Sequence, residues 1–523
     1  MYCDPLKAQN SSKNLGLLMY LLPHLLLIFL LLPAIVLADV VPAFQGAQGA
    51  GAVSRGGRGG VVIEVTNLND SGDGSLRSAI NASGPRIVVF RVGGIINTET
   101  TLQMKNPYIT IAGQTAPGGG ILINGKNVAG ATIAINSHDV ILRFLRVRNG
   151  SGGGTDEDDT IGVYGGYNII VDHCSVSWST DENISTWAWD SAQWGAPKNV
   201  TWSHNLLAEG LLEHSKGMLS GASSSAEADE MLDIDIHHNL FMHHYDRTPF
   251  VKHKSGRVVN NISYNWSGFG LSTYGGVHLD IIRNLYKPGP DYQQENAEAI
   301  IGSSPVPDAA TFNPKDCPAL CPYLFVEGNK GPRHQNPDRD NWRFMSDDWG
   351  SRSIASAQYQ RHTQLPEQDF PITALHVSKL ENQLLPSVGA SHRLTDLGVL
   401  VPNRDAVDTR LIDEYMNGTG SVITYESTVG GLPRIAAGNA YLDGDKDGMA
   451  DRWEVSVGLD PSDSKDGNLD MDDDGISNIE DFLNGRTPNL FTQPIVKSGS
   501  FDFLALLILS ILVPGMRITA RFG

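Results

Sequence analysis

The stretch NIIVDHCSVSW, residues 168–178, decides the fold prediction. Its first four residues are mostly β-branched and apolar, as expected of a short strand with one buried face. Similar runs recur along the chain, and most begin about 20 to 30 residues after the previous one, a spacing typical of solenoids. The runs cover residues 87–92, 108–111, 140–144, 168–171, 199–202, 232–236, 257–259 and 278–282.

The connections between these runs indicate how the strands pair. They are rich in Gly, Asn and Asp, which favour turns, but they lack the two-residue turn signals of hairpins. Strands joined in this way are expected to pair in parallel, one coil above the next. We therefore predict an all-β fold, a right-handed parallel β-helix, for residues 39–435, with a helix at residues 406–417 near its end.

Asparagine recurs just after several strands, and the pattern has two possible causes. In a coiled fold, stacked side-chain amides would hydrogen-bond the turns of successive coils. Ordinary turn propensity would produce the same pattern. The residues are Asn205, Asn239, Asn261, Asn265 and Asn284.

The composition narrows the class of ligand. The chain has 523 residues, which favours several domains or an elongated repeat fold, and its formal net charge is −19 at pH 7. An acidic chain of this kind is a poor general partner for nucleic acid, and none is expected. A polyanionic substrate would need local basic residues or metal ions to offset the repulsion. We expect the protein to be a monomer.

Both ends of the chain carry apolar segments. Lys7 and Lys13 precede a long apolar run, and residues 1–38 are predicted to be a signal peptide cleaved near Ala38. The run is long enough to remain as a membrane anchor instead. Residues 498–523 hold an apolar run followed by arginines, which indicates a sorting or anchor segment, with a terminal helix of the fold as the alternative. The protein is therefore expected to be secreted or attached to the cell surface.

Regularly spaced acidic residues indicate a separate small module at residues 441–485. Two loops place oxygen-bearing side chains at the positions that bind Ca²⁺ in EF-hand-like loops, with Gly at the sharp turn. The pattern resembles dockerin and thrombospondin type 3 modules, which implies a role in stability or attachment; an acidic linker without metal is the alternative. The predicted ligands are Asp443, Asp445, Asp447, Asp451 and Glu454 in the first loop, and Asp470, Asp472, Asp474, Asn478 and Asp481 in the second.

Three polar clusters follow predicted strands. The first has acidic residues at 156–159 and continues with Asp181 and Glu182, the second spans residues 214–218, and the third spans residues 243–252. Corresponding positions of stacked coils lie about 5 Å apart. The carboxylates, Lys216 and Arg247 are therefore expected to line one groove, where a metal ion would bridge an anionic substrate.

Several motifs resemble the pectate lyase family, polysaccharide lyase family 1. Val171-Asp172-His173-Cys174-Ser175 is similar to the family segment beside its calcium site, and Arg247-Thr248-Pro249 is similar to its catalytic Arg-x-Pro segment. Residues 44–51 and 112–119 add to the resemblance, which spans roughly residues 43–435. The resemblance implies a secreted lyase that cleaves a polygalacturonate-type polysaccharide by calcium-dependent β-elimination.

The resemblance also implies roles for single residues. Arg247 would take the proton from carbon 5 of the sugar, and Lys216 would bind its carboxylate. Calcium would be held by Glu157, Asp159, Asp181 and Glu182, and Lys252, His173 and His214 would contact the substrate. Phe250 stands where relatives often carry a second arginine, and Lys252 where other members carry another. Lysine is a point charge and not a bidentate fork, so weaker carboxylate binding or a different uronate is expected.

The same residues are compatible with functions other than a lyase. A glycoside hydrolase with two carboxylates, or a non-catalytic carbohydrate-binding surface protein, would use the same fold. The pairs His237-His238 and His243-His244 suggest zinc, but adjacent strand residues point to opposite faces, which argues against a shared ion. Cys317 and Cys321 would form a small local disulfide or part of a metal site.

Overall fold

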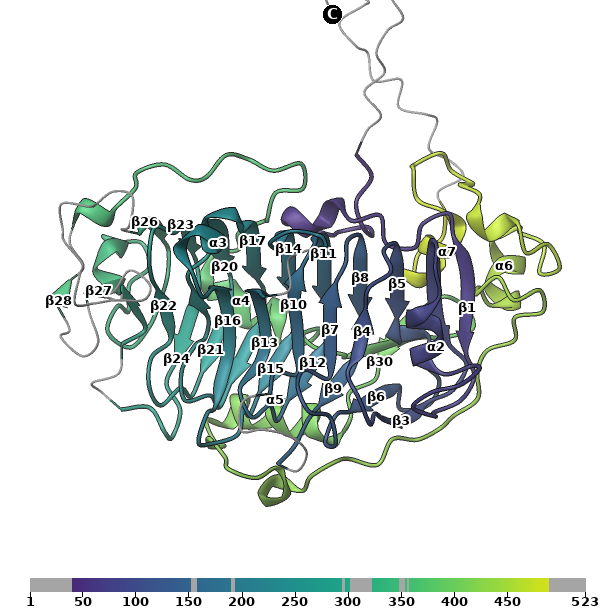
Figure 1. The fold of residues 1–523 in the computed structure, drawn as a ribbon, viewed down its shortest axis with the longest axis horizontal. Helices are drawn as coiled ribbons and strands as arrows, with labels where there is room; N and C mark the ends of the chain where they lie inside the picture. The colour runs from purple at the N-terminus through teal and green to yellow at the C-terminus, as the bar shows by residue number, and fades with distance from the viewer. Residues whose placement is uncertain are drawn as a thin grey trace, which may run out of the picture. The chain divides into compact units, whose positions relative to one another are not determined.

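The computed structural model describes residues 40–151, 158–189, 193–293, 297–301, 322–347, 353–354 and 357–488. All of these residues except Val40 belong to one compact unit that begins at Val41. The unit is a right-handed parallel β-helix, which confirms the predicted fold class (Figure 1). No helix within the described ranges is both long and apolar enough to cross a membrane. The predicted segments 1–38 and 498–523, and both Cys317 and Cys321, lie outside the described residues.

From β2 to β25, each coil contributes one strand to each of three sheets in the same order. Sheet A consists of β1 (Val61–Val65), β2 (Arg86–Phe90), β5 (Ile109–Ala112), β8 (Val140–Arg143), β11 (Tyr167–Asp172), β14 (Lys198–Ser203), β17 (Leu232–His237), β20 (Ser255–Val259), β23 (His278–Ile282) and β26 (Tyr323–Glu327). Sheet B consists of β3 (Gly94–Asn97), β6 (Ile121–Asn124), β9 (Arg146–Arg148), β12 (Ser175–Ser177), β15 (Leu206–Ala208), β18 (Leu240–Met242), β21 (Ile262–Tyr264) and β24 (Leu285–Lys287). Sheet C consists of β4 (Leu102–Met104), β7 (Ile133–Asn136), β10 (Ile161–Gly165), β13 (Glu182–Ala188), β16 (Lys216–Ala222), β19 (Phe250–Val251), β22 (Leu271–Thr273), β25 (Ala299–Ile301), β27 (Met345–Asp347) and β28 (Ser353–Ile354).

Neighbouring coils pair in register. Ile169 in β11, for example, lies opposite Val140 in β8 and Val200 in β14. All three side chains are fully buried and belong to one apolar core that runs through the coils. Register matters in such a fold because a shift by one residue would turn the apolar side chains outward.

The strands expected from the sequence rhythm all fall in sheet A. Sheet A strands β2 to β23 are long enough to show a run of β-branched or alternating residues, whereas most sheet B strands have only three residues. Such short strands carry too few residues for a periodic pattern, so the rhythm reports one sheet of the three.

Stacked asparagine side chains connect the turns between sheets A and B. Asn205 donates from Nδ2 to Oδ1 of Asn239 at 3.0 Å, and Asn239 donates in the same way to Asn261 at 3.0 Å. The ladder continues through Asn284, Asn329 and Asn341. This confirms stacked amides for four of the five asparagines singled out above. Asn265 instead donates to Asp291 Oδ2 and lies against His243.

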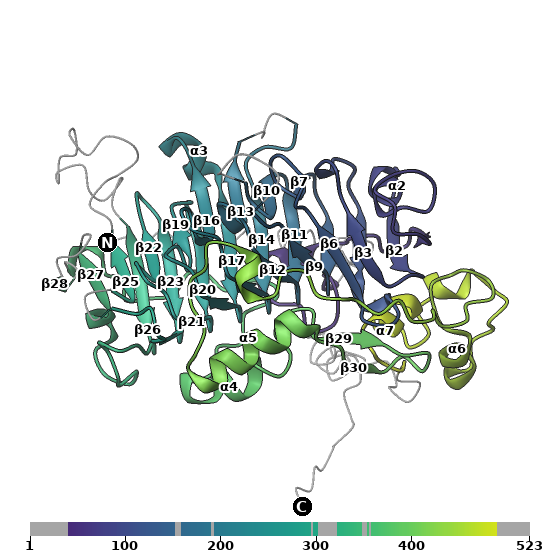
Figure 2. The same cartoon turned by 90° about the horizontal axis from the view of Figure 1, so that it is seen from below.

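Two helices, α4 (Val377–Leu384) and α5 (Ala406–Asn417), cover the outer face of sheet B (Figure 2). Leu380 and Leu411 pack there against outward-facing residues of β15, β18 and β21. Helix α5 has the predicted bounds; it begins after the N-cap Asp405 and ends at Gly418, which has φ 70°. The other α-helices are α2 (Leu76–Asn81), α3 (Ser225–Glu230), α6 (Asp451–Val457) and α7 (Asn478–Leu483). The 3₁₀ helices are η1 (Ala50–Val53), η2 (Gly113–Thr115), η4 (Asn341–Phe344), η5 (Ala357–Tyr359), η6 (Glu426–Val429) and η7 (Asp466–Asn468), and β29 (His392–Leu394) pairs with β30 (Leu400–Pro402) as an antiparallel hairpin.

The glycine-rich entry covers the outer face of sheet A around β11 and β14. Gly51 donates its backbone N–H to Thr201 Oγ1 at 2.8 Å, and Ala50 donates to Asp235 Oδ2 at 2.8 Å. A Cβ atom on Gly51 would lie 2.1 Å from the carbonyl oxygen of Ile169, so only glycine permits this approach.

Candidate active site

Charged side chains from three successive coils meet at the start of the sheet C strands. Glu182 begins β13 and Lys216 begins β16, and the two residues are paired in register. Lys216 in turn forms a parallel bridge with Asp246, the residue before Arg247. The expectation that these clusters occupy the same turn of successive coils is confirmed.

Three carboxylates, Asp159, Asp181 and Glu182, form the acidic part of this cluster. One oxygen of each lies within 4.8 Å of the others. Burial, reinforced by the Asp181 carboxylate, raises the pKa of Asp159 to about 6. Burial and the Asp159 carboxylate raise the pKa of Glu182 well above its usual value. Buried acids that repel one another in this way fit a divalent cation with oxygen ligands, such as Ca²⁺.

Neighbouring groups orient these carboxylates. The Tyr164 hydroxyl donates to Asp159 Oδ2 at 2.9 Å, and Ser185 Oγ donates to the same oxygen. His214 Nδ1 lies 2.9 Å from Asp181 Oδ1, so His214 belongs to the cluster. Of the acidic run before β10, Glu157 lies outside the described residues, and Asp158 Oδ1 accepts a hydrogen bond from the Gly130 N–H at 2.7 Å.

The basic part of the cluster consists of Lys216 and Arg247. Lys216 Nζ lies 2.9 Å from Asp246 Oδ1, and Arg247 Nη1 donates to Glu182 Oε1. Burial opposes the charge of Arg247, but Glu182, Asp246 and Asp181 outweigh burial and raise the pKa of Arg247. About a quarter of the Arg247 side chain, 26%, is exposed, so a ligand at the surface can reach it.

Lys252 lies against aromatic rings on the same sheet. Its Nζ is 4.4 Å from the centre of the Trp187 ring and 5.8 Å from that of Phe250. Gly221 makes room for this arrangement, because a Cβ atom there would lie 2.2 Å from Lys252 Cγ. Burial, together with the nearby Arg247 guanidinium, lowers the pKa of Lys252 to about 8.

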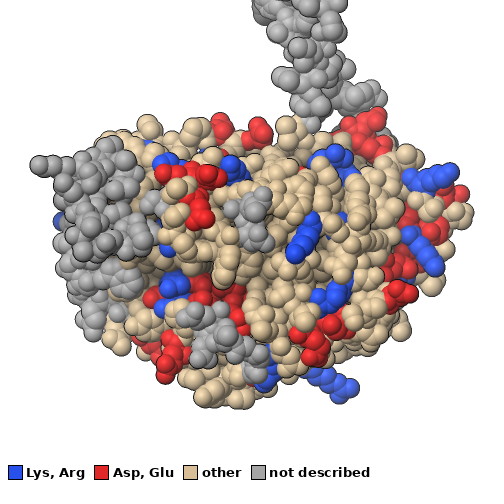
Figure 3. Space-filling view, in the orientation of Figure 1, with Lys and Arg blue, Asp and Glu red and all other residues tan. Residues whose placement is uncertain are grey.

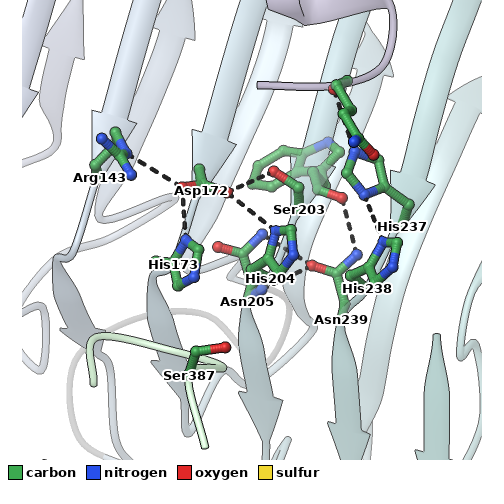
Figure 4. Close-up of polar contacts among 12 residues, drawn as sticks. Arg143, Asp172, His173, Ser203, His204, Asn205, His237, His238, Asn239 and Ser387 are labelled. Carbon is green, nitrogen blue, oxygen red and sulfur yellow. Dashed lines mark hydrogen bonds and ion pairs between the residues drawn. The ribbon is translucent and has the colours of Figure 1, made fainter. Parts of the chain in front are cut away.

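His173 lies in a different turn, beside Asp172 and His204 (Figure 4). Its Nδ1 is 2.6 Å from Asp172 Oδ2, and its ring stacks on His204 with centres 4.7 Å apart. This turn joins sheets A and B, whereas Lys216 begins a strand of sheet C and Arg247 lies between sheets B and C. The structure therefore does not bring His173 to the other predicted substrate residues.

Asp172, His173 and His204 have the spacing of metal ligands. However, neighbouring groups already offset the negative charge of the Asp172 carboxylate. It accepts hydrogen bonds from Arg143 Nε at 3.1 Å and Ser203 Oγ at 2.8 Å. Although burial raises it, contacts with His173, His204 and Arg143 hold the pKa of Asp172 well below its usual value. We therefore regard this group as a structural network.

The expectation that His237 and His238 point to opposite faces is wrong. Their Nδ1 atoms lie 3.0 Å apart. The reason is that β17 ends at His237 and His238 has a left-handed backbone, φ 54°, so strand alternation no longer applies. Among the described residues, neither this pair nor His243 and His244 belongs to a group with metal-ligand spacing.

The predicted calcium loops bring most of their acids together. Asp443, Asp445 and Asp447 form one group with metal-ligand spacing, and Asp470, Asp472 and Asp474 form another. A third group joins Asp447 and Glu454 to Asp466. Asp451 Oδ1 accepts from the Gly444 N–H at 2.7 Å, Asn478 Oδ1 accepts from the Met471 N–H at 3.1 Å, and Asp481 Oδ1 lies 3.1 Å from Arg486 Nη1.

Three residues of these sites received no individual role from the sequence. Tyr164 lies on the strand after the acidic run, Asp246 precedes Arg247, and Asp466 lies between the two predicted calcium loops. The register of Lys216 with its neighbours is the signal that would have found Asp246. Asp466 has no such signal, because it lies outside both loop patterns.

Comparisons with known proteins identify relatives of this chain. The sequence profile described as pectate lyase matches residues 20–296, more than half of the chain. "Probable pectate lyase C" from Aspergillus fumigatus is 32% identical over 461 residues, which covers 86% of this chain and 94% of the relative. The protein of that name from Emericella nidulans is 33% identical over 466 residues, covering 88% and 96%. The crystal structure of jun a 1, the major allergen from cedar pollen, superimposes with a TM-score of 0.46 at 17% identity over 66% of this chain and 92% of the allergen.

Proposed function

The chain belongs to the pectate lyase family and is a polysaccharide lyase, and from this premise we propose that it cleaves an acidic, polygalacturonate-type polysaccharide by calcium-dependent β-elimination. The observation that supports this proposal most is the contact of Arg247 with Glu182 beside Lys216. In this proposal the base Arg247 lies beside the carboxylates that would hold Ca²⁺ and beside Lys216, which would bind a sugar carboxylate.

An acidic substrate would be repelled by a chain with a net charge of −19, so the binding site must supply positive charge. Lys216 and Lys252 supply positive charge for sugar carboxylates, and His214 lines the same site through Asp181. Asp159, Asp181 and Glu182, together with Glu157, would hold Ca²⁺. Bound Ca²⁺ would supply further positive charge to a sugar carboxylate as negative charge develops on it.

Arg247 would act as the base. It would take the proton from carbon 5, and the electrons of that bond would form the double bond between carbons 4 and 5. The bond from carbon 4 to the glycosidic oxygen would break with its electron pair on that oxygen, which then takes up a proton from water. Arginine is normally protonated, and the carboxylates around Arg247 hold the proton more firmly. Compensation of the Glu182 charge and the approach of Lys216 and Lys252 would act in the opposite direction, toward the neutral guanidine.

The remaining assignments are part of the same proposal. Residues 39–435 form the catalytic domain, and the loops at 443–454 and 470–481 bind Ca²⁺ as a dockerin-like or thrombospondin type 3-like module. Residues 1–38 direct secretion, and residues 498–523 serve as a sorting or anchor segment. The working protein is a secreted or surface-attached monomer whose partner is the polysaccharide.

A digestion panel tests the activity. Polygalacturonate and other uronate polymers are incubated with the protein, with Ca²⁺ or with EDTA, and ultraviolet absorbance follows the unsaturated product ends. We expect absorbance to rise on polygalacturonate with Ca²⁺ and to stay flat with EDTA. Saturated reducing ends without absorbance would indicate hydrolysis and overturn the proposal, and binding without any product would indicate a non-catalytic protein.

A further inference from the structure

The C-terminal loops hold buried carboxylate oxygens that lack hydrogen-bond partners within the described part of the chain. Glu454 is 0% exposed and neither of its oxygens has such a partner. Three further oxygens are likewise buried without a hydrogen-bond partner among the described residues: Asp447 Oδ2, Asp466 Oδ1 and Asp481 Oδ2. Acids left unpaired in the interior are costly, so these oxygens indicate that cations belong among them.

Acidic side chains gather closely around these oxygens. Oxygens of Asp443, Asp445 and Asp447 lie within 4.8 Å of one another, and so do oxygens of Asp470, Asp472 and Asp474. Figure 3 shows acidic side chains gathered over the end of the fold that carries α6 and α7.

Asp466 completes the first of these groups from outside its loop. It lies in η7, between the two loops, and one of its oxygens is within 4.8 Å of oxygens of Asp447 and Glu454. Its backbone carbonyl also accepts from Asn478 Nδ2 at 2.8 Å, at the start of α7. A cation held by Asp466 would therefore join the first loop to the helix that follows the second.

The helices that follow the loops pack on the N-terminal coils of the β-helix. Trp453 of α6 and Phe482 of α7 are fully buried in a cluster with Ile87 and Val89 of β2. Ile87 and Val89 alternate along β2 with Val88 and Phe90, which belong to the inner core. The two helices therefore cover the outer face of sheet A near β1, the first described strand of that sheet.

Polar contacts also join the C-terminal loops and helices to the β-helix. Arg58 Nε lies 2.9 Å from both oxygens of Glu480, and Arg143 Nη1 lies 2.7 Å from Asn484 Oδ1. Arg91, after β2, lies over the Tyr441 ring at 4.6 Å and reaches Asp443 Oδ2 at 3.8 Å. Basic residues of the β-helix thus contact residues within or beside both loops.

We propose that Ca²⁺ bound in these loops, with Asp466 as an additional ligand, holds α6 and α7 as a cap on β1, β2 and β5. The inference rests on the proposed calcium binding of the loops and is independent of the chemistry at sheet C. Without the ion, repulsion among the loop acids loosens the helices and uncovers Ile87 and Val89. Calcium then has a second role in this protein, the stability of the first coils.

Hydrogen exchange of the full chain tests the cap without any substitution in the loops. The double variant Asp159→Asn/Asp181→Asn removes acids of the sheet C cluster, so that calcium effects arise from the loops. We expect Ca²⁺, compared with EDTA, to slow exchange at residues 86–90 and to leave residues 255–259 unchanged. Equal effects on the two strands, or no effect on either, would overturn the cap.

Two single variants test the new ligand. Asp466→Asn is expected to weaken calcium binding at one site by about 10- to 100-fold, measured by titration calorimetry, and to abolish the slowed exchange at residues 86–90. Asp463→Asn, in the same linker but exposed, is the matched control and should behave as the parent chain. Equal calcium affinity in the two variants would exclude Asp466 as a ligand.

The outcomes separate the two proposals. If calorimetry detects no loop binding in the parent chain, the calcium module itself fails, and the cap fails with it. If the loops bind Ca²⁺ but exchange at residues 86–90 does not respond, only the cap fails. Lyase activity decides neither result.

Discussion

Arg247 contacts Glu182 from two coils away, and Lys216 lies in the coil between them. The contact exists because each of the three residues occupies the same turn of its coil. It places the arginine directly beside the candidate calcium ligands, so the charge of the cluster and the proton affinity of the arginine are coupled.

Replacing Arg247 tests its role as the base. Arg247→Ala should lower the turnover number by at least about a hundredfold, the scale of a lost general base, while oligosaccharide binding changes much less. The measurement is initial-rate absorbance at saturating Ca²⁺ together with calorimetric binding of a uronate oligomer. Lys254→Ala, which removes a surface cation paired with Asp229, is the control and should keep parental rates. If the variant loses substrate binding and turnover to the same extent, Arg247 binds the substrate and does not abstract the proton.

The lowered pKa of Lys252 predicts that substrate affinity depends on pH. Burial lowers its pKa to about 8, so the ammonium is mostly charged below that pH and mostly neutral above it. The affinity for an acidic substrate should therefore fall as pH rises from about 7 to about 9. In Lys252→Arg the guanidinium stays charged across this range, and the fall should disappear. The Michaelis constant measured at constant Ca²⁺ reports the effect; an unchanged profile in the variant would assign it to another group.

Calcium demand should depend on the carboxylate cluster. Asp181→Asn removes one charge next to Glu182 and should raise the Ca²⁺ concentration for half-maximal activity by about tenfold or more. Asp413→Asn, on the exposed side of α5, is the matched control. The readout is activity across a calcium series after treatment with EDTA. Identical calcium curves for the two variants would remove Asp181 from the set of ligands.

The asparagine ladder predicts a stability effect far from the groove. Asn239 is fully buried, donates to the Trp202 carbonyl at 2.8 Å and accepts from the Asn205 N–H at 2.9 Å. Asn239→Ala leaves several buried groups unpaired and should cost more than about 2 kcal/mol of unfolding free energy. Asn97→Ala, which removes an exposed amide contact with Asn124, should cost about 0.5 kcal/mol or less. Chemical denaturation compares the two, and similar losses would show that the ladder adds little.

The sequence predicted the parts of the fold that have a local pattern. The strands of sheet A and helix α5 carry their periodicity within a few residues, so their positions were predicted. The three-residue strands of sheet B carry no such local pattern. They form because they pair with the strands of the coils on either side. Within the candidate site, the sequence was sufficient to predict Lys216, Arg247 and the acids after β12, because all of them follow strands at similar spacing.

What the sequence missed depends on contacts between distant segments. His173 shares a motif with Asp172, but its turn joins sheets A and B, and no local pattern distinguishes that turn from the next. Asp466 approaches Asp447 and Glu454 only because the linker folds back on the first loop. The rings of His237 and His238 meet because the backbone turns left-handed at the end of β17, which strand alternation does not describe.

The register that aligns Glu182, Lys216 and Asp246 restricts how such a protein can diverge. A single inserted residue between β12 and β13 would slide one charge past its neighbour and separate the groups. Gain or loss of an entire coil outside these three would preserve the alignment and change only the length of the stack along which a polymer could lie. Evolution of new chain-length preferences in this architecture is therefore expected to proceed by duplication or deletion of complete turns.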